Sequence, residues 1–314
     1  SLHADPRAST GTAPLGALAV IQHQKRHTFT WEDPMQTVTI DNITDVVIGA
    51  MSDETPPRVK GVLTAFVRHM HDFVRETRLT HDEWLVGIDY MTRAAALTDE
   101  KRNEFILLSD IFGLETLVDA ISHDAEENET ESAVLGPFFR EGSPVLPTGA
   151  TISQRGAEDG PPAFVEGQIT NAKGEPIAGA MIHVWETGPE GLYEQQDPNQ
   201  PDMNLRGRFK TDDQGRYAFR GVRPVSYPIP YDGPTGDLLQ LMGRHPYRPA
   251  HIHMVVEAPG YRKLISQLYD STDEYLESDS VFSVKGSLII DFKPAPTDAD
   301  VDYVVEHNVV LKAA

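Results

Sequence analysis

Apolar residues in the first half of the chain recur at helical spacing. Residues 58–74 carry an apolar position every three or four residues, behind a Thr-Pro-Pro entry, and predict an amphipathic helix. A Thr-x-x-Glu capping box at 80–83 predicts a second helix that continues to residue 91. Residues 99–112 predict a third helix that ends at Gly113, and a short fourth helix follows. The N-terminal half is therefore expected to be helical.

These helices by themselves leave two interpretations open. A small helical bundle accounts for their periodicity. The apolar positions Phe66, Val67, Met70 and Phe73 equally suit a helical face for dimerisation, because a large apolar helix face needs cover. The spacing alone does not choose between a bundle and a dimer interface.

Beyond Pro162, short apolar runs separated by turns replace the helical pattern. The predicted strands are 164–169, 180–186, 216–219, 251–256, 263–268 and 286–292. Many short strands without intervening helical patterns are typical of an antiparallel sandwich or barrel. The expected fold class is α+β and mainly β, with an N-terminal helical region followed by an antiparallel β-sandwich.

A stretch rich in Gly, Pro and Ser at 142–160 marks the boundary between the two halves. We predict a helical linker and dimerisation domain at 41–145 and a β-sandwich catalytic domain at 146–314. Residues 1–25 lack the basic-then-apolar order of a secretory signal and resemble a mobile arm or a remnant of processing, and we predict an arm at 1–40.

Composition narrows the classes of partner. The 314 residues include no cysteine, which excludes disulfide frameworks and thiolate metal sites and is compatible with a reducing cytoplasm. The formal net charge of −21 argues against nucleic acid as a partner, because phosphate contacts need concentrated Lys and Arg. No apolar run approaches the roughly 20 residues that a membrane-spanning helix needs. We therefore expect a cytoplasmic protein with no membrane span.

The candidate chemistry centres on the predicted strand that contains His251 and His253. Side chains at i and i+2 of a strand point to the same face, so the two imidazoles could bind one metal ion. Two polar residues on the solvent face of a strand explain the same spacing. Tyr193 and Tyr227 lie in two turns, and a phenolate is a hard oxygen donor suited to Fe(III). Either tyrosine alone is more simply explained as a buried aromatic residue.

Several segments together resemble the intradiol ring-cleaving dioxygenase family. The most specific is Arg-Pro-Ala-His-Ile-His at 248–253, preceded by Asp-Gly-Pro-Thr-Gly at 232–236 and Leu-Met-Gly-Arg-His at 241–245. Further matching segments lie at 107–110, 135–138, 207–212 and 215–217. The resemblance runs from Ile40 to the C-terminus, and this combination of motifs is far more specific than the His-x-His pair.

The resemblance implies a non-haem Fe(III) site in the β-sandwich, with one ion per subunit. By position its ligands are Tyr193, Tyr227, His251 and His253. Arg248 matches the family's active-site arginine, and Gln267 matches a glutamine next to the site. The family's N-terminal helices form the interface of a homodimer, often around a bound phospholipid.

The resemblance also implies the reaction. A catechol-type substrate binds through two adjacent oxygens, and Tyr227 leaves its position as a ligand and accepts a proton. Arg248 stabilises the negative charge that develops on the ring. Both atoms of O2 enter the product, and the bond between the two hydroxyl-bearing carbons breaks. Tyr227, Arg248 and Gln267 are therefore the expected catalytic residues.

The expected ring pocket is most similar to that of the hydroxyquinol-cleaving enzymes in the family. Its residues are Leu107, Asp110, Val134, Leu135, Gly136, Pro137, Phe138, Ile229, Pro230, Arg248 and Val281. A carboxylate at Asp110 would hydrogen-bond a third hydroxyl and stay unpaired with plain catechol, unless neighbouring backbone already satisfies it. The expected reaction converts hydroxyquinol (benzene-1,2,4-triol) into 3-hydroxy-cis,cis-muconate/maleylacetate.

Three alternatives remain at this point. Within the family, the chain could be a catechol or chlorocatechol 1,2-dioxygenase. A prealbumin-like carrier shares the Gly-x-Pro-Ile-x-Gly-Ala turn at 174–180, but it has no need for two tyrosines and two histidines together. A zinc hydrolase uses His-x-His but normally adds a third histidine or a carboxylate.

Overall fold

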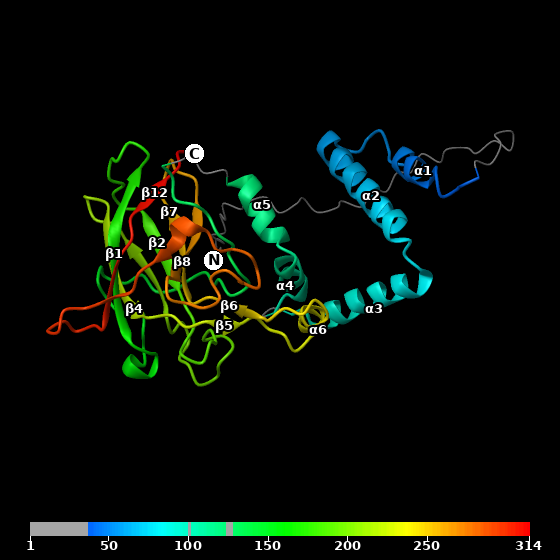
Figure 1. Ribbon diagram of the computed structural model, residues 1–314. Coiled ribbons are helices and arrows are strands. Elements are labelled where there is room, and N and C mark those ends of the chain that lie inside the picture. Colours follow the sequence, from blue (N-terminus) through cyan, green and yellow to red (C-terminus); the bar gives the residue numbers. More distant parts are fainter. Residues whose placement is uncertain (1–36, 100–101, 124–127) are drawn as a thin grey trace, which may run out of the picture. The chain divides into compact units, whose positions relative to one another are not determined.

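The computed structural model describes residues 37–99, 102–123 and 128–314 (Figure 1). The chain divides into two compact units, Ser1–Thr80 and His81–Ala314. The predicted arm at 1–40 lies outside the described residues apart from its last four. The role of this arm and the predicted domain boundary near residue 145 stay predictions.

Two helices form the described part of the first unit, α1 (Ile43–Gly49) and α2 (Pro57–Thr77). Pro57 occupies the first turn of α2, where a missing N–H is tolerated, and Arg78 ends the helix in the left-handed conformation with φ 50°. The amphipathic helix expected at 58–74 is present. α2 has no buried residue within the described chain, and most of its large apolar side chains are exposed.

The second unit begins with three helices, α3 (His81–Leu97), α4 (Glu104–Ile111) and α5 (Leu114–Ser122). The start predicted at residue 99 for the third helix is wrong. The Asn103 side chain accepts the N–H groups of Phe105 and Ile106 at 3.1 and 3.2 Å, and this N-cap sets the first turn at Glu104. Gly113, with φ 68°, separates α4 from α5 as expected.

The long strand β1 (Pro162–Asn171) is the centre of the first sheet. β4 (Arg216–Val222) pairs with it antiparallel, whereas β11 (Tyr303–Glu306) and β12 (Val309–Leu311) pair with it parallel. β10 (Lys293–Pro294) pairs with β11 at the edge. The hydrophobic pattern does not predict β10–β12, because strands of two to four residues are too short to show a period.

The second sheet carries the candidate site, and its strand order is β3-β2-β7-β8-β9. The strands are β2 (Met181–Trp185), β3 (Arg206–Lys210), β7 (His251–Glu257), β8 (Leu264–Asp270) and β9 (Ile289–Ile290). All neighbours pair antiparallel except β8 and β9. The shorter elements are η1 (Gly156–Glu158), η2 (Gly286–Leu288), α6 (Pro234–Leu241) and the ribbon of β5 (Tyr227–Pro228) with β6 (Tyr247–Arg248).

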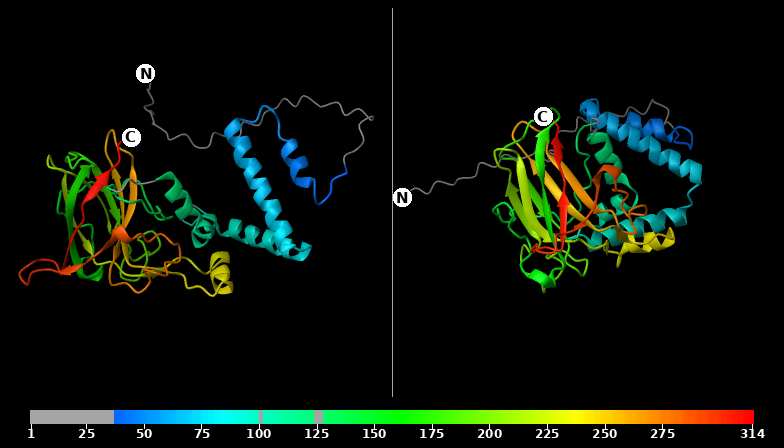
Figure 2. Two further views of the ribbon diagram at one scale, coloured as in Figure 1. Left: turned by 45° about the horizontal axis from the view of Figure 1, so that its top comes forward. Right: turned by 60° about the vertical axis from the view of Figure 1, so that its left-hand side comes forward.

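The core lies between the two sheets (Figure 2). Ile252, Met254 and Val256 of β7 project into it and meet Val165 of β1 and Phe219 of β4, all with no exposed surface. Each such side chain stabilises the fold by about 1.5–3 kcal/mol. Because strand side chains alternate, the odd-numbered residues of β7 face the other way, toward α4 and the β5–β6 ribbon.

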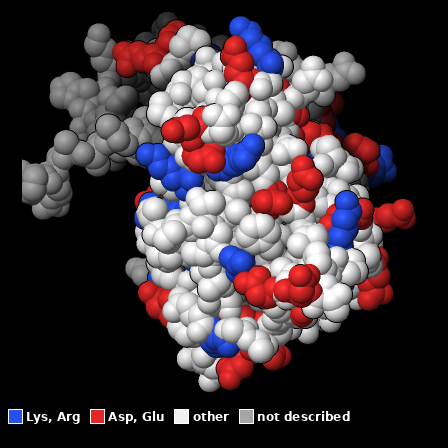
Figure 3. Space-filling model, turned by 90° about the vertical axis from the view of Figure 1, so that its left-hand side faces the viewer, with Lys and Arg blue, Asp and Glu red and all other residues white. Residues whose placement is uncertain are grey.

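The expected combination of an N-terminal helical region and a β domain is confirmed. Among the described helices, none is long and apolar enough to cross a membrane. On the face shown in Figure 3, acidic and basic side chains are interspersed rather than gathered by sign.

Candidate metal centre and active site

Two histidines of β7 face away from the sandwich core. β7 is paired with β2 on one side and β8 on the other, so its backbone is held at both edges. His251 and His253 are each only 2% exposed. Their burial rules out the alternative of two polar residues on a solvent face.

Trp185 of β2 orients His253. The two residues are cross-strand partners, and their rings stack with centroids 4.6 Å apart and planes 4° apart. Gly136 has φ 73°, and a Cβ at this position would lie 3.3 Å from Cε1 of His253. The imidazole therefore lies between an aromatic face and a closely approaching glycine.

Tyr193 is held in the loop that follows β2. Its ring stacks on Phe138 with centroids 4.7 Å apart, and the guanidinium of Arg206 lies 5.8 Å from its centroid. Gly191 has φ 71°, and a Cβ at this position would lie 2.7 Å from Cβ of Tyr227. Only glycine lets this loop approach Tyr227 so closely.

The phenol oxygens and imidazole nitrogens of the four expected ligands converge. Tyr193 Oη lies 2.8 Å from Tyr227 Oη and 2.9 Å from His253 Nε2. His251 Nε2 lies 3.1 Å from His253 Nε2 and 3.4 Å from Tyr227 Oη. Four donor atoms from a loop, a ribbon and a strand thus form a closed ring.

Both histidines are neutral in this setting. Burial, together with the positive charge of Arg248, lowers the pKa of His251 to about 3, and burial likewise lowers the pKa of His253 well below its ordinary value. His251 Nδ1 lies 2.7 Å from the carbonyl oxygen of Pro249, which only accepts, so Nδ1 carries the proton. The Nε2 lone pair of His251 is therefore directed at the other donors. His253 Nδ1 is buried without a hydrogen-bond partner among the described residues.

Burial raises the pKa of Tyr193 and of Tyr227, so the protein alone keeps both phenols protonated. A phenolate pair at this position needs a strong positive charge, as a trivalent metal ion supplies. Two phenol oxygens and two neutral imidazoles therefore fit Fe(III). Residues 37–99, 102–123 and 128–314 include no group of three or more His, Cys, Asp or Glu that could hold a metal, as the usual zinc site requires.

Arg248 is buried beside His251 and is fixed by hydrogen bonds. Its NH1 group lies 3.1 Å from His251 Nε2, and its NH2 group donates to Gln267 Oε1 at 2.8 Å. Gln267 Nε2 donates in turn to the carbonyl oxygen of Val134 at 2.6 Å. Although burial acts to lower it, the pKa of Arg248 is raised well above its ordinary value by Asp279. The guanidinium is therefore charged and tied to the wall of the adjacent cavity.

That cavity lies beside the four donor atoms. Its lining consists of Leu107, Asp110, Val134, Gly136, Pro137, Phe138, Tyr227, Ile229, Arg248, His253 and Val281. Two residues expected in the pocket do not line it: Leu135 packs against the Trp185 cluster, and Pro230 is half-buried outside the lining. The part of any of these residues in substrate binding stays a prediction.

Asp110 presents a free oxygen to this cavity. Its Oδ1 is buried and has no hydrogen-bond partner within the described part of the chain. Burial and the neighbouring carboxyl of Glu115 raise the pKa of Asp110 to about 9, so the side chain is a neutral acid at pH 7 rather than a carboxylate. Glu115 Oε1 accepts the N–H of Leu135 at 3.3 Å. Because Asp110 Oδ1 has no hydrogen-bond partner among the described residues, neighbouring backbone does not satisfy it.

The sequence did not point to three further residues around Arg248. Its NH2 group lies 2.5 Å from Ser283 Oγ and 3.3 Å from Tyr269 Oη, and its Nε donates to Asp279 Oδ1 at 3.2 Å. The available signal was the Asp-x-Val-x-Ser order at 279–283, which is typical of an Asx turn. Nothing in that order links it to an arginine 31 residues earlier.

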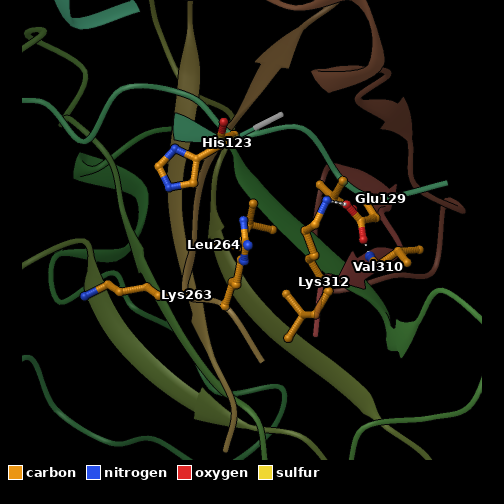
Figure 4. Close-up of a pocket in the computed structure, with 10 residues that line it drawn as sticks. His123, Glu129, Lys263, Leu264, Val310 and Lys312 are labelled. Carbon is orange, nitrogen blue, oxygen red and sulfur yellow. Dashed lines mark hydrogen bonds and ion pairs between the residues drawn. The ribbon is translucent and has the colours of Figure 1, made fainter. Parts of the chain in front are cut away.

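A second depression, shown in Figure 4, lies away from these residues. Two of its lysines are already paired, Lys312 with Glu129 at 3.2 Å and Lys263 with Glu257 at 2.7 Å. In Figure 4 Lys263 points away from the other lining residues. None of the expected ligands lines it, so it is a weaker candidate than the cavity beside β7.

Two family models match the chain. Residues 56–130 match the model described as catechol dioxygenase N terminus, and residues 134–313 match the model described as dioxygenase. Together they cover α2 to the last strand.

Curated relatives and a solved structure agree with these matches. The chain is 46% identical over 250 residues to a hydroxyquinol 1,2-dioxygenase of Rhizobium sp. strain MTP-10005, covering 79% of this chain and 84% of that protein. It is 45% identical over 275 residues to a catechol 1,2-dioxygenase of Candida albicans, covering 85% and 91%. The crystal structure of hydroxyquinol 1,2-dioxygenase from Pseudomonas putida DLL-E4 aligns with a TM-score of 0.81 at 42% identity, covering 88% of this chain and 99% of that chain.

Proposed function

The chain belongs to the intradiol ring-cleaving dioxygenase family, and on this premise we propose that it cleaves the ring of hydroxyquinol between its adjacent hydroxyl-bearing carbons. The triol and O2 give 3-hydroxy-cis,cis-muconate/maleylacetate, and both oxygen atoms enter the product. The observation that carries the proposal is one cavity that is lined by Tyr227 and His253 of the donor ring and also by Asp110, whose Oδ1 has no hydrogen-bond partner among the described residues.

Tyr193, Tyr227, His251 and His253 would hold one ferric ion per subunit. Such an ion would supply the positive charge that favours deprotonation of the phenols and of two substrate hydroxyls. The convergence of four buried donors, with both imidazoles neutral, supports this ligand set.

Tyr227 is proposed to accept a substrate proton. It lines the cavity and belongs to a strand of only two residues, so its ring borders the substrate space and its backbone has few pairings. Tyr193 is packed between Phe138 and Arg206 and is not part of the lining. This difference supports Tyr227 Oη as the base and Tyr193 as the permanent ligand.

Arg248 is proposed to stabilise negative charge on the substrate ring. It lines the cavity as a buried, fixed cation, and fixed charges in a water-excluded site interact strongly with developing charge. Gln267 maintains the direction of this guanidinium by accepting from NH2 while donating to Val134.

Asp110 is proposed to select the triol. A neutral carboxyl can hydrogen-bond the third hydroxyl without adding negative charge beside an electron-rich ring. With catechol the buried Oδ1 would remain unpaired, which costs about 1–3 kcal/mol. The catechol 1,2-dioxygenase of Candida albicans among the relatives makes catechol the competing candidate.

The proposal extends to assembly and location. The exposed apolar face of α2 supports a homodimer through the N-terminal helices, with phospholipid as an interface component. A cysteine-free chain is compatible with a cytoplasmic location. Extraction of lipids from the purified dimer followed by mass spectrometry tests the lipid, and cell fractionation tests the location.

Oxygen uptake with hydroxyquinol, catechol and a chlorocatechol, measured side by side on iron-loaded protein, tests the substrate. We expect the highest kcat/KM for hydroxyquinol. A higher kcat/KM for catechol would replace hydroxyquinol as the substrate while leaving the family unchanged.

Iron content and colour test the ligands. Tyrosinate bound to Fe(III) absorbs visible light, so we expect Tyr193→Phe, His251→Ala and His253→Ala to lose iron and colour. Tyr217→Phe is the matched control, because Tyr217 is also buried but donates to the carbonyl of His307. Full iron occupancy in one of the three variants would remove that residue from the ligand set.

A further inference from the structure

We propose that Asp279 is the positioning residue of the active-site arginine, and that the same carboxylate shapes the cavity wall by folding residues 279–283. This inference rests on the proposed function of Arg248. Asp279 lies outside the motif at 248–253. Its carboxylate would link the position of the Arg248 charge to the shape of the cavity wall at Val281.

One edge of the Arg248 guanidinium is held by the segment that Asp279 begins. Nε lies 3.2 Å from Asp279 Oδ1, and NH2 lies 3.4 Å from Asp279 Oδ2 and 2.5 Å from Ser283 Oγ. Tyr269 Oη, 2.7 Å from Ser283 Oγ, adds a further contact to the same NH2 group. The remaining NH1 group is the one that lies 3.1 Å from His251 Nε2. The carboxylate thus fixes which nitrogen of the cation is directed at the metal donors.

The carboxylate also closes its own turn. Asp279 Oδ1 accepts the N–H of Val281 at 3.2 Å, and Oδ2 accepts the N–H and the hydroxyl of Ser283 at 3.0 and 2.9 Å. Between them Phe282 adopts the left-handed conformation with φ 58° and is 52% exposed. This bend directs Val281 into the cavity and brings Ser283 back to the arginine.

The two charges depend on each other because both are removed from water. Arg248 is 3% exposed and Asp279 is 4% exposed. A buried charge is tolerated when a partner of opposite sign and hydrogen bonds compensate it, and loss of one partner leaves the other uncompensated. Loss of both partners removes the uncompensated charge. The effects of the two single substitutions and of their combination on stability therefore have predictable signs.

The chain offers a close control for Asp279. Asp270 is 3% exposed, accepts from Arg223 Nε at 2.7 Å, and accepts the N–H and hydroxyl of Thr272 at 3.0 and 2.9 Å. It therefore combines a largely buried arginine pair with its own Asx turn, as Asp279 does. Neither Asp270 nor Arg223 lines the cavity.

The kinetic experiment compares Asp279→Asn with Asp270→Asn on iron-loaded protein with hydroxyquinol. We expect Asp279→Asn to retain iron and colour and to lose about 10- to 100-fold in kcat, with KM changed by less than about threefold, because a displaced cation weakens mainly the transition state. Asp270→Asn should keep kcat within about twofold of the unmodified protein, since the Asp270 carboxylate bonds Arg223 and Thr272 rather than Arg248. Equal kcat values for the two variants would overturn the positioning role.

A stability cycle tests the pairing without any turnover. Thermal unfolding of iron-free protein is measured for Arg248→Met, Asp279→Asn and the double variant. We expect the double variant to unfold at a higher temperature than Arg248→Met, because it no longer buries a lone carboxylate. A midpoint equal to or below that of Arg248→Met would overturn the pairing. If Arg248→Met does not fold, Ser283→Ala is measured instead. We expect the kcat of Ser283→Ala to fall even though Asp279 still pairs with Arg248. An unchanged kcat would overturn the role of the turn.

Different results would contradict the proposed function and the role of Asp279. Absence of turnover with hydroxyquinol, catechol and chlorocatechol in the unmodified protein would contradict the proposed function. The stability cycle would still decide whether Asp279 and Arg248 form the compensating pair.

Discussion

Burial decides the charge of the polar side chains around the four donor atoms. His251 and His253 are neutral because an imidazolium is poorly solvated there, and Asp110 is neutral because burial and Glu115 raise its pKa to about 9. Arg248 and Asp279 stay charged because each compensates the other. The site without metal therefore holds the Arg248–Asp279 ion pair beside neutral donors.

Replacement of Asp110 tests selectivity for the triol. We expect Asp110→Ala to lower the ratio of kcat/KM for hydroxyquinol over catechol by about 10- to 100-fold, because the third hydroxyl loses its partner. Asp110→Asn is the control that keeps a neutral polar group at the same position, and it should retain most of the preference. A ratio that is the same in Asp110→Ala and the unmodified protein would contradict the proposed selection.

The buried carboxyl of Glu186 makes the stability of the protein depend on pH, separately from catalysis. Its Oε1 accepts the N–H of Val222 at 2.9 Å, its Oε2 has no partner among the described residues, and burial raises its pKa from 4.5 to about 8. In the unfolded chain the group ionises near pH 4.5, whereas in the folded chain it stays protonated to about pH 8. Its contribution to stability is therefore fully present below pH 4.5 and is lost as the pH rises to 8.

Glu186→Gln removes this ionisation. We expect the free energy of unfolding of the variant, relative to the unmodified protein, to rise by roughly 3 kcal/mol between pH 5 and pH 8. Urea unfolding at the two pH values measures this difference. Glu166→Gln, at an exposed glutamate of β1, reports the effect of removing one surface charge. A constant difference across the pH range would mean that Glu186 is ionised in the folded protein.

At the scale of elements, α5 contacts two segments that contribute to the cavity wall, residues 134–136 and Val281. Glu115 accepts from the N–H of Leu135, and Thr116 Oγ1 donates to the carbonyl of Val281 at 3.0 Å. Asp119, on the same helix, pairs with Lys285 Nζ at 3.0 Å. A helix of nine residues is too short to be stable alone, so these contacts hold it in place.

Loss of the Lys285 amino group tests this attachment. Lys285 Nζ also donates to the carbonyl of Ser132, so Lys285→Met should destabilise the protein by about 1–3 kcal/mol in urea unfolding. Lys263→Met is the control, because Lys263 pairs with Glu257 on the surface. This variant should lose less than about 1 kcal/mol of folding stability. Equal costs for the two variants would contradict an anchoring role for Lys285.

At the scale of the whole molecule, the main open feature is the apolar face of α2, which the described residues of its own unit leave exposed. Its members, all 42–57% exposed, are Val59, Val62, Leu63, Phe66, Met70, Phe73 and Val74. They recur at three- and four-residue spacing and therefore form one stripe. This exposure supports the proposed interface between chains, which stays a prediction.

Charges placed on this stripe test the interface. We expect Phe66→Asp combined with Phe73→Asp to shift the protein from dimer to monomer at micromolar concentration, because an interface core does not accommodate unpaired carboxylates. Sedimentation velocity measures the change. Arg68→Asp puts the same group on the opposite side of α2 and should leave the dimer intact. A protein that is monomeric before substitution would remove α2 from the proposed assembly.

Many of the helices and strands were predicted from the local spacing of apolar residues. The period of apolar residues indicated α2 and the strands β1, β2, β4, β7 and β8, because side-chain direction in a helix or strand follows from the backbone itself. The same alternation placed His251 and His253 on one face. The family motif then named the two tyrosines, and the structure brings their oxygens within 3.4 Å of imidazole nitrogens.

Contacts between distant segments were decided only by the tertiary structure. The parallel pairing of β1 with β11 and β12 and the pairing of Asp279 with Arg248 have no local period or fixed spacing. The neutral state of Asp110 likewise follows from burial, which one residue's identity does not contain. The sequence by itself indicated α2, the longer strands, the four expected donor residues and the family, because these depend on local geometry and on motifs. Only the packed fold decided which residues surround the donors and what charge they carry, because both depend on which distant groups exclude water from them.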